Sequence, residues 1–160
     1  MEQSYTSGAD YSGINARIAI VSARFNGHIV EAMRAAAHTT LLENGVSENN
    51  IGSIHVPGAF ELPIVCKTMA VANEYHGIIA LGCVIRGDTP HFDYVCQGCT
   101  NGIMQASLDA NVPIAFGLLT TNTVEQALFR SSSENLNNNK GRDVALCVLE
   151  MINTLSSIHK

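Results

Sequence analysis

Residues Leu81–Tyr94 (LGCVIRGDTPHFDY) pass from an apolar run into a polar turn and then into the start of a helix. The run begins at Ile78 and is nearly continuous, which is typical of a parallel strand covered on both faces. Thr89 suits an N-cap and Pro90 suits the first helical position, so we expect a helix to begin at Pro90. Its free N–H groups would attract a phosphate or another anion beside His91, which exchanges a proton near neutral pH.

Length and composition indicate one globular domain with few surface charges. The chain has 160 residues, of which 46% are hydrophobic and 14% are charged, a composition compatible with a surface partly covered by other subunits. The net charge is −5 and there is no Lys/Arg run, which argues against nucleic acid as a partner. We expect no secretory signal and no membrane partner. The five cysteines lie mostly in apolar patterns, which predicts a reduced cytoplasmic protein.

Four apolar strands alternate with helices along the chain. We expect strands at 17–22, 53–56, 78–85 and 113–119, with helices ending near residues 43, 73, 110, 130 and 157. This alternation predicts an α/β fold, a three-layer αβα sandwich with a four-stranded parallel sheet of flavodoxin-like type. Residues 1–13 are expected to form a polar N-terminal arm, and residues 14–160 a single domain.

Several local patterns have a structural interpretation. The helix after the second strand is expected to pack Val65, Met69 and Ala72 against the core. Asn122, followed three residues later by Glu125, resembles a capping box. Cys96 and Cys99 form a C-x-x-C that could be a redox pair or half a zinc site, but both fit an apolar helical stripe and core packing is favoured. The other histidines are scattered without ligand spacing, so no metal site is predicted.

Chemically useful side chains follow three of the strands. Phe25 follows the first strand, Glu61 the second and Asp88–His91 the third. Taken singly, Phe25 could be a core plug and Glu61 a favourable charge at a helix N-terminus. In an open parallel sheet, however, ligands bind beyond the carboxyl ends of the strands, where all three fall. The site would hold a flat ring, hydroxyl-rich groups and a phosphate, and the absence of Gly-rich nucleotide motifs argues against a dinucleotide or nucleoside triphosphate.

Several longer motifs resemble the 6,7-dimethyl-8-ribityllumazine synthase family, which acts at the penultimate step of riboflavin biosynthesis. The match runs in order and spacing from about Arg17 to the end of the chain. It is carried by Ala23–Asn26, Pro57–Pro63, Gly82–Tyr94 and Phe116–Thr121, and later by Glu125–Ala127, Arg130, Asn139–Gly141 and Glu150–Met151.

The resemblance implies a condensation of two small-molecule substrates. These are 5-amino-6-(D-ribitylamino)uracil and 3,4-dihydroxy-2-butanone 4-phosphate, and the products are the lumazine, phosphate and water. Neither a metal nor an organic cofactor is implied. Two alternatives of the same fold are a non-catalytic flavin or lumazine binder and a shell-forming protein. The presence of both His91 and Arg130 favours the enzyme over the binder.

The resemblance also implies roles for individual residues. Phe25 would stack on the pyrimidine, Glu61 would accept hydrogen bonds from ribityl hydroxyls, and His91 would transfer protons. Asp88 and Thr89 would hold the phosphate. Ala59 and Phe60 would contact the ring and the ribityl chain, and the backbone of Cys83, Val84 and Ile85 would contact the pyrimidine. Phe116 and Arg130 would reach the site of a neighbouring subunit, where Arg130 would bind the phosphate. Lys140 and Asp143 would be supporting charged residues.

A ring of five subunits is a further implication of the resemblance. Shell-forming relatives join their last two helices by a tight turn that contains Gly. Here Ser131–Asn139 forms the connection, which is Gly-free and longer by about two residues. We therefore expect a free homopentamer, or a decamer of two rings, rather than an icosahedral shell.

Overall fold

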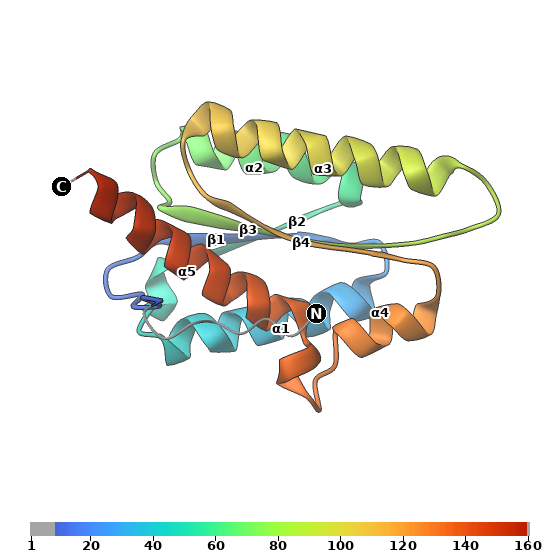
Figure 1. The fold of residues 1–160 in the computed structure, drawn as a ribbon, viewed down its shortest axis with the longest axis horizontal. Helices are drawn as coiled ribbons and strands as arrows, with labels where there is room; N and C mark the ends of the chain where they lie inside the picture. The colour runs from blue at the N-terminus through green and yellow to red at the C-terminus, as the bar shows by residue number, and fades with distance from the viewer. Residues whose placement is uncertain (1–8, 160) are drawn as a thin grey trace.

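The computed structural model describes residues 9–159, and strands and helices alternate along them as predicted (Figure 1). The strands are β1 (Ile18–Ala23), β2 (Ile51–Val56), β3 (Gly77–Ile85) and β4 (Ile114–Thr121). The helices are α1 (Gly27–Glu43), α2 (Leu62–Val71), α3 (His91–Ala110), α4 (Val124–Arg130) and α5 (Lys140–Ile158). Three short 3₁₀ helices are η1 (Glu48–Asn50), η2 (Ala59–Glu61) and η3 (Leu136–Asn138).

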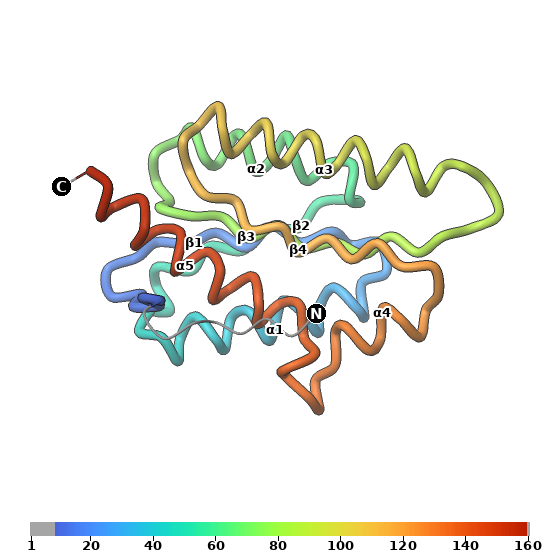
Figure 2. Tube along the Cα trace, viewed as in Figure 1, coloured from blue at the N-terminus to red at the C-terminus, as the bar shows by residue number. Residues whose placement is uncertain are grey.

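The four strands form one parallel sheet in the order β2-β1-β3-β4. Helices α2 and α3 cover one face, and α1, α4 and α5 cover the other (Figure 1). The predicted three-layer α/β sandwich with a four-stranded parallel sheet is therefore confirmed. The connection from β3 to α3 extends well beyond the end of the sheet, where the chain trace makes its widest turn (Figure 2).

Strand β3 joins the two hydrophobic cores. Its residues Ile78 to Leu81 are fully buried, as expected for a strand covered on both faces. Ile79 and Leu81 belong to the core under α1 and α5, while Ile78 and Ala80 belong to the core under α2 and α3. Full burial of an Ile or Leu side chain contributes about 1.5–3 kcal/mol to the free energy of folding. The two cores therefore stabilise the sheet from both of its faces.

The predicted inner face of α2 is partly wrong. Leu62, Cys66 and Ala70 are its buried residues, spaced four apart. Val65 and Met69 pack beside them and are only partly buried, while Ala72 is exposed and follows the end of the helix. The difference arises because Leu62, the first residue of α2, packs over Gly82 of β3, where an added Cβ would lie 3.1 Å from the Leu62 side chain.

The capping box lies one residue later than predicted. The Thr123 hydroxyl accepts a hydrogen bond from the Gln126 N–H at 3.2 Å, and the Gln126 side chain accepts one from the Thr123 N–H at 3.3 Å. Strand β4 continues to Thr121, opposite Ile85 of β3, so α4 begins only at Val124. The Asn122 side chain does not cap α4. Its Oδ1 instead accepts a hydrogen bond from the Arg86 Nε at 3.0 Å.

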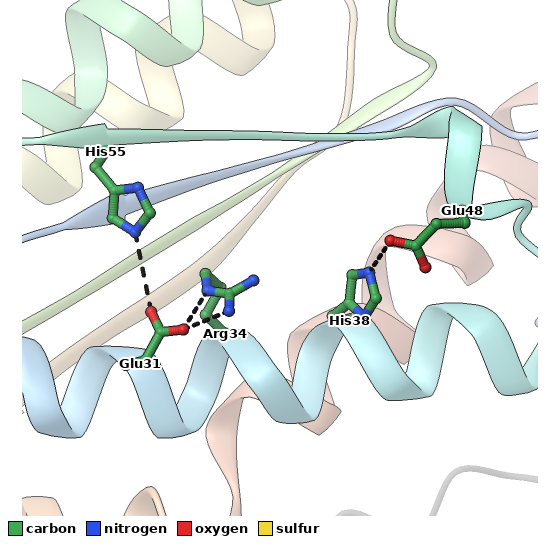
Figure 3. A network of polar contacts seen from close by, with 5 residues as sticks. All are labelled: Glu31, Arg34, His38, Glu48 and His55. Carbon is green, nitrogen blue, oxygen red and sulfur yellow. Dashed lines mark hydrogen bonds and ion pairs between the residues drawn. The ribbon is translucent and has the colours of Figure 1, made fainter.

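Polar contacts tie the edge strand β2 and the segment before it to α1 (Figure 3). Glu31 pairs with Arg34 and lies 3.9 Å from His55 of β2, while His38 lies 2.9 Å from Glu48. The hydrogen bond from Arg34 lowers the pKa of the Glu31 carboxyl. Because these groups are partly exposed, each pair contributes only about 0–1 kcal/mol.

No helix within residues 9–159 combines the length and apolar character needed to cross a membrane.

Candidate active site

A pocket of about 680 Å³ lies at the carboxyl ends of β1, β2 and β3. Residues that follow these strands line it, together with the first turns of α3. The lining residues are Phe25, Gly58, Ala59, Phe60, Glu61, Cys83, Val84, Ile85, Gly87, Thr89, His91, Phe92, Tyr94 and Val95. Nine of the residues proposed from the sequence are therefore together in one pocket of one chain, namely Phe25, Ala59, Phe60, Glu61, Cys83, Val84, Ile85, Thr89 and His91.

Phe25 is held at the pocket by its backbone. The Arg24 N–H donates to the Val56 carbonyl at 2.8 Å, and the Phe25 N–H donates to the Pro57 carbonyl at 3.2 Å. These bonds continue the pairing of β1 with β2 beyond the ends of both strands. The Phe25 side chain is 70% exposed, so it is not a core plug, and its ring is available to a flat ligand.

Asn26 links the end of β1 to Cys83 of the pocket wall, a role that sequence reasoning missed. Its backbone adopts a left-handed conformation with φ 54°, which Asn tolerates better than most residues, and α1 begins at the next residue. The Asn26 Nδ2 donates to the Cys83 carbonyl at 2.9 Å. This bond ties the end of β1 to the end of β3. A polar residue in a strand-to-helix turn is the only sequence signal for it.

Phe60 and Glu61 reach the pocket from η2. Phe60 packs on α3 at Gly98, where an added Cβ would lie 2.7 Å from the Phe60 ring, and its side chain is still 62% exposed. Glu61 is partly buried, and its Oε2 lies 3.3 Å from the position of a Cβ added at Gly58. The absence of a side chain at Gly58 therefore leaves room for the carboxylate at the pocket wall.

The connection from β3 to α3 leads into the N-terminus of α3 at one end of the pocket. Helix α3 begins at His91, one residue later than predicted, and Pro90 precedes it. The Thr89 hydroxyl accepts a long hydrogen bond of 3.4 Å from the His91 N–H. The N-terminus of this 20-residue helix opens at the pocket, where free N–H groups and the helix dipole favour a negative charge. Both Thr89 and His91 are exposed to incoming ligands.

Burial disfavours the thiolate form of the cysteines on α2, β3 and α3. Burial raises the pKa of Cys83 to about 11 and the pKa of both Cys66 and Cys99 to about 12. Burial also raises the pKa of Cys96. A reactive cysteine needs a lowered pKa, so these thiols are poor nucleophiles, and Cys99 packs in the core beneath α3. Within residues 9–159 no three His, Cys, Asp or Glu side chains are grouped to hold a metal ion.

The other residues proposed from the sequence lie outside this pocket. Asp88 is in the exposed β3–α3 connection but is not part of the lining. Phe116 is in the first half of β4 and is 37% exposed, and Arg130 is the exposed last residue of α4. Lys140 and Asp143 are in the first turn of α5, where burial raises the pKa of the Asp143 carboxyl. These four residues of β4, α4 and α5 do not join Phe25 and His91 in the same chain.

An open parallel sheet with a pocket at its carboxyl ends is the architecture of an α/β protein that binds a small molecule. The aromatic ring, the carboxylate, the helix N-terminus and the imidazole at the pocket suit a ligand with a flat ring, hydroxyl groups and a phosphate. A sequence model of the family described as 6,7-dimethyl-8-ribityllumazine synthase matches residues 15–156. The chain belongs to this family, whose members act in riboflavin biosynthesis and are enzymes of transferase type.

Proposed function

We propose that this chain condenses 5-amino-6-(D-ribitylamino)uracil with 3,4-dihydroxy-2-butanone 4-phosphate to form 6,7-dimethyl-8-ribityllumazine. One observation carries the proposal. Phe25, Glu61, His91 and the N-terminus of α3 surround a single pocket in a chain of this family. Each of them matches a different part of the two substrates.

The pyrimidine substrate occupies the side of the pocket formed by β1 and β2. Its ring stacks on the exposed face of Phe25, with Ala59 and Phe60 beside it, and its ribityl hydroxyls donate to Glu61. The backbone of Cys83, Val84 and Ile85 contacts the ring edge. The Cys83 carbonyl already accepts a hydrogen bond from the Asn26 side chain at 2.9 Å.

The phosphate of the second substrate binds at the N-terminus of α3. The Thr89 hydroxyl and the first N–H groups of the helix are its donors. Asp88 can assist only through its backbone N–H, because its carboxylate would repel the phosphate. Arg130 is the positive partner whose planar fork suits a phosphate, and it must come from another copy of the chain because it lies outside this pocket.

The chemistry proceeds through groups that the substrates supply. The pyrimidine amine attacks the ketone and releases water to form an imine. Loss of a proton beside the imine expels phosphate, and the second amine then closes the ring with release of a further water. His91 is the group that moves protons in elimination and ring closure. Holding the two substrates together contributes up to about 7–11 kcal/mol of barrier reduction, so positioning is the larger part of catalysis.

A second subunit completes the site. Apolar side chains are exposed on β4 and α4, and a different exposed apolar group lies on η2, α2 and α3, where Phe60 and Tyr94 also line the pocket. The first group comprises Phe116, Val124, Leu128 and Phe129, and the second Phe60, Ile64, Tyr94 and Met104. Two unlike surfaces that fit each other generate a ring. In such a ring, Phe116 and Arg130 of one subunit reach its neighbour's pocket, and Lys140 and Asp143 support them.

An absorbance assay with both substrates tests this function. We expect formation of the lumazine together with stoichiometric phosphate, and neither product when one substrate is omitted. Binding of the pyrimidine or of a flavin without turnover would contradict the enzymatic proposal and favour a binding protein of the same fold.

A further inference from the structure

Arg86 stands between the end of the sheet and the start of α3. Its backbone N–H donates to the Thr121 carbonyl at 2.9 Å, which continues the β3–β4 pairing one residue beyond β3. The backbone of Arg86 is therefore fixed to the sheet. Its side chain is partly exposed and is free to reach across to the helix.

The Arg86 guanidinium contacts three neighbours at once. Two of its nitrogens donate to the two carboxylate oxygens of Asp93, at 2.9 and 3.2 Å, which is a bidentate pair. Its Nε donates to the Asn122 Oδ1 at 3.0 Å. Its central carbon lies 4.3 Å from the centre of the Phe92 ring, so the planar cation also stacks on that ring.

These contacts link the sheet to the residues that directly follow His91. Phe92 and Asp93 belong to the first turn of α3, whereas Asn122 follows β4. Within residues 9–159, Gly87 and Asp88 make no hydrogen bond to the rest of the chain. Thr89 holds the helix start through a long bond of 3.4 Å from the His91 N–H, and the Arg86 side chain bridges the connection directly.

Stability alone does not account for this arrangement. The Arg86 and Asp93 side chains are 43% and 56% exposed, and exposed ion pairs contribute little to folding. The planar Arg86 guanidinium nevertheless restricts the orientation of the Asp93, Asn122 and Phe92 side chains that it contacts. These contacts therefore act on orientation, because Asp93 and Phe92 lie in the first turn of α3, which also carries His91.

We propose that Arg86 is a positioning residue that, through Asp93 and Phe92, fixes the first turn of α3 and so orients His91 and the phosphate-binding N–H groups for the reaction. This inference rests on the proposed function. It assigns to Arg86 no contact with either substrate.

The test compares Arg86→Gln, Asp93→Asn and the double variant in the full-length assembly. We expect each single variant to lower kcat by about 10- to 100-fold, because small displacements of a catalytic group have effects of this size. KM for both substrates should change less than about threefold. The double variant should be no worse than the single variants, because they break one shared link. Arg86→Lys should recover only part of kcat, since an ammonium lacks the fork.

Lys67→Gln is the matched control. Lys67 of α2 pairs with Asp109 of α3 at 3.0 Å, and both side chains are exposed to a similar degree. This pair ties down the opposite end of the same helix, about 27 Å from His91 at 1.5 Å per residue. We expect its kcat and KM to match the wild type.

Two kinetic results would overturn the proposal. A selective rise in KM for the butanone phosphate in Arg86→Gln, with normal kinetics in Asp93→Asn, would mean that Arg86 binds the phosphate directly. Wild-type kinetics in both variants would mean that the pair is only a surface contact.

Amide hydrogen exchange supplies a measurement that needs no activity. We expect faster exchange in the first turns of α3 in Arg86→Gln and Asp93→Asn, and no change there in Lys67→Gln. Unchanged exchange in the first two would contradict the tether. If the wild type makes no lumazine, the proposed function fails, but the exchange experiment still tests whether Arg86 fixes this turn.

Discussion

At the scale of single residues, His91 carries the most specific prediction. It is exposed at the pocket, and the hydrogen-bonded first turn of α3 sets its backbone. If it transfers protons, His91→Ala should lower kcat by roughly 10²–10⁴-fold. The assembly and the binding of the pyrimidine should remain intact. Steady-state kinetics measures the loss, and a variant with full activity would show that another group or water moves the protons.

Phe25 offers a test of stacking that separates binding from folding. Phe25→Ala should weaken binding of the pyrimidine substrate by about 1–3 kcal/mol, because a flat ring loses its stacking partner. Phe25→Trp should keep or strengthen it. Since the ring is 70% exposed, neither change should lower the melting temperature much. Titration calorimetry measures the affinity, and unaltered affinity in the Ala variant would remove Phe25 from the site.

The residue scale also shows what the sequence can predict of the site. Phe25, Glu61, Thr89 and His91 could be placed together because each follows a strand, and parallel strands end at one edge of the sheet. Asn26 escaped prediction because its side chain bonds to a carbonyl 57 residues away, which no local pattern reveals.

At the scale of elements, the start of α5 depends on one buried side chain. Asn139 is fully buried, its Oδ1 accepts from the Gly141 N–H at 2.8 Å, and its Nδ2 donates to the Ser132 carbonyl at 3.0 Å. Asn139→Ala should cost about 1–3 kcal/mol in the free energy of unfolding, because it removes a helix cap and leaves the partly buried Ser132 carbonyl without this donor. Urea titration at fixed protein concentration measures the change.

Asn135→Ala is the control for this cap. Asn135 is exposed and caps only the short η3 through a 3.2 Å bond from the Asn137 N–H. We expect it to lower the free energy of unfolding by less than half as much as Asn139→Ala. Equal effects would show that the whole connection, rather than the buried cap, holds α5 in place.

Element identity was predictable from the sequence, whereas details of side-chain environment were not. The order and type of the four strands and five α-helices were predicted from apolar runs and turn signals, whereas the three 3₁₀ helices were not. Strand β2 begins at Ile51, two residues earlier than predicted, because Gly52, a residue type depleted in strands, interrupts the apolar pattern at its start. The capping box shifted because β4 continues to Thr121, and the inner face of α2 is set by the burial of Leu62. Both depend on contacts between elements distant in the sequence, which local patterns do not reveal.

At the scale of the whole molecule, a site shared between subunits makes a strong prediction. His91→Ala and Arg130→Ala rings should each be nearly inactive. In rings assembled from an equal mixture, however, about a quarter of the sites pair an intact His91 with an intact Arg130 from the neighbour. Coexpression should therefore restore activity to about a quarter of the wild-type value.

A mixture of His91→Ala with Phe25→Ala is the control for this experiment. Both residues line the same pocket of one chain, so no mixed site recovers both. We expect no gain of activity beyond that of the separate variants. Equal recovery in both mixtures would contradict the assignment of Arg130 to a neighbouring pocket.

The size of the assembly depends on how α4 and α5 are joined. The connection from Ser131 to Asn139 is not a loose bulge, because both ends are buried and η3 orders its later part. Asn139 also donates weakly to the Ala32 carbonyl of α1, at 3.5 Å. A connection this well anchored sets the direction of both helices, so its extra length should disturb contacts between rings more than contacts within a ring.

We therefore expect sedimentation at micromolar concentration to give a particle of about five or ten times the chain mass of 17.1 kDa. In the proposed ring, the exposed apolar surface of η2, α2 and α3 meets that of β4 and α4, whereas a shell would also require rings to meet at a fixed angle. A particle near a megadalton would show that the longer connection is harmless to shell formation. A monomer would contradict the shared site as well, because Arg130 would then have no neighbouring pocket to complete.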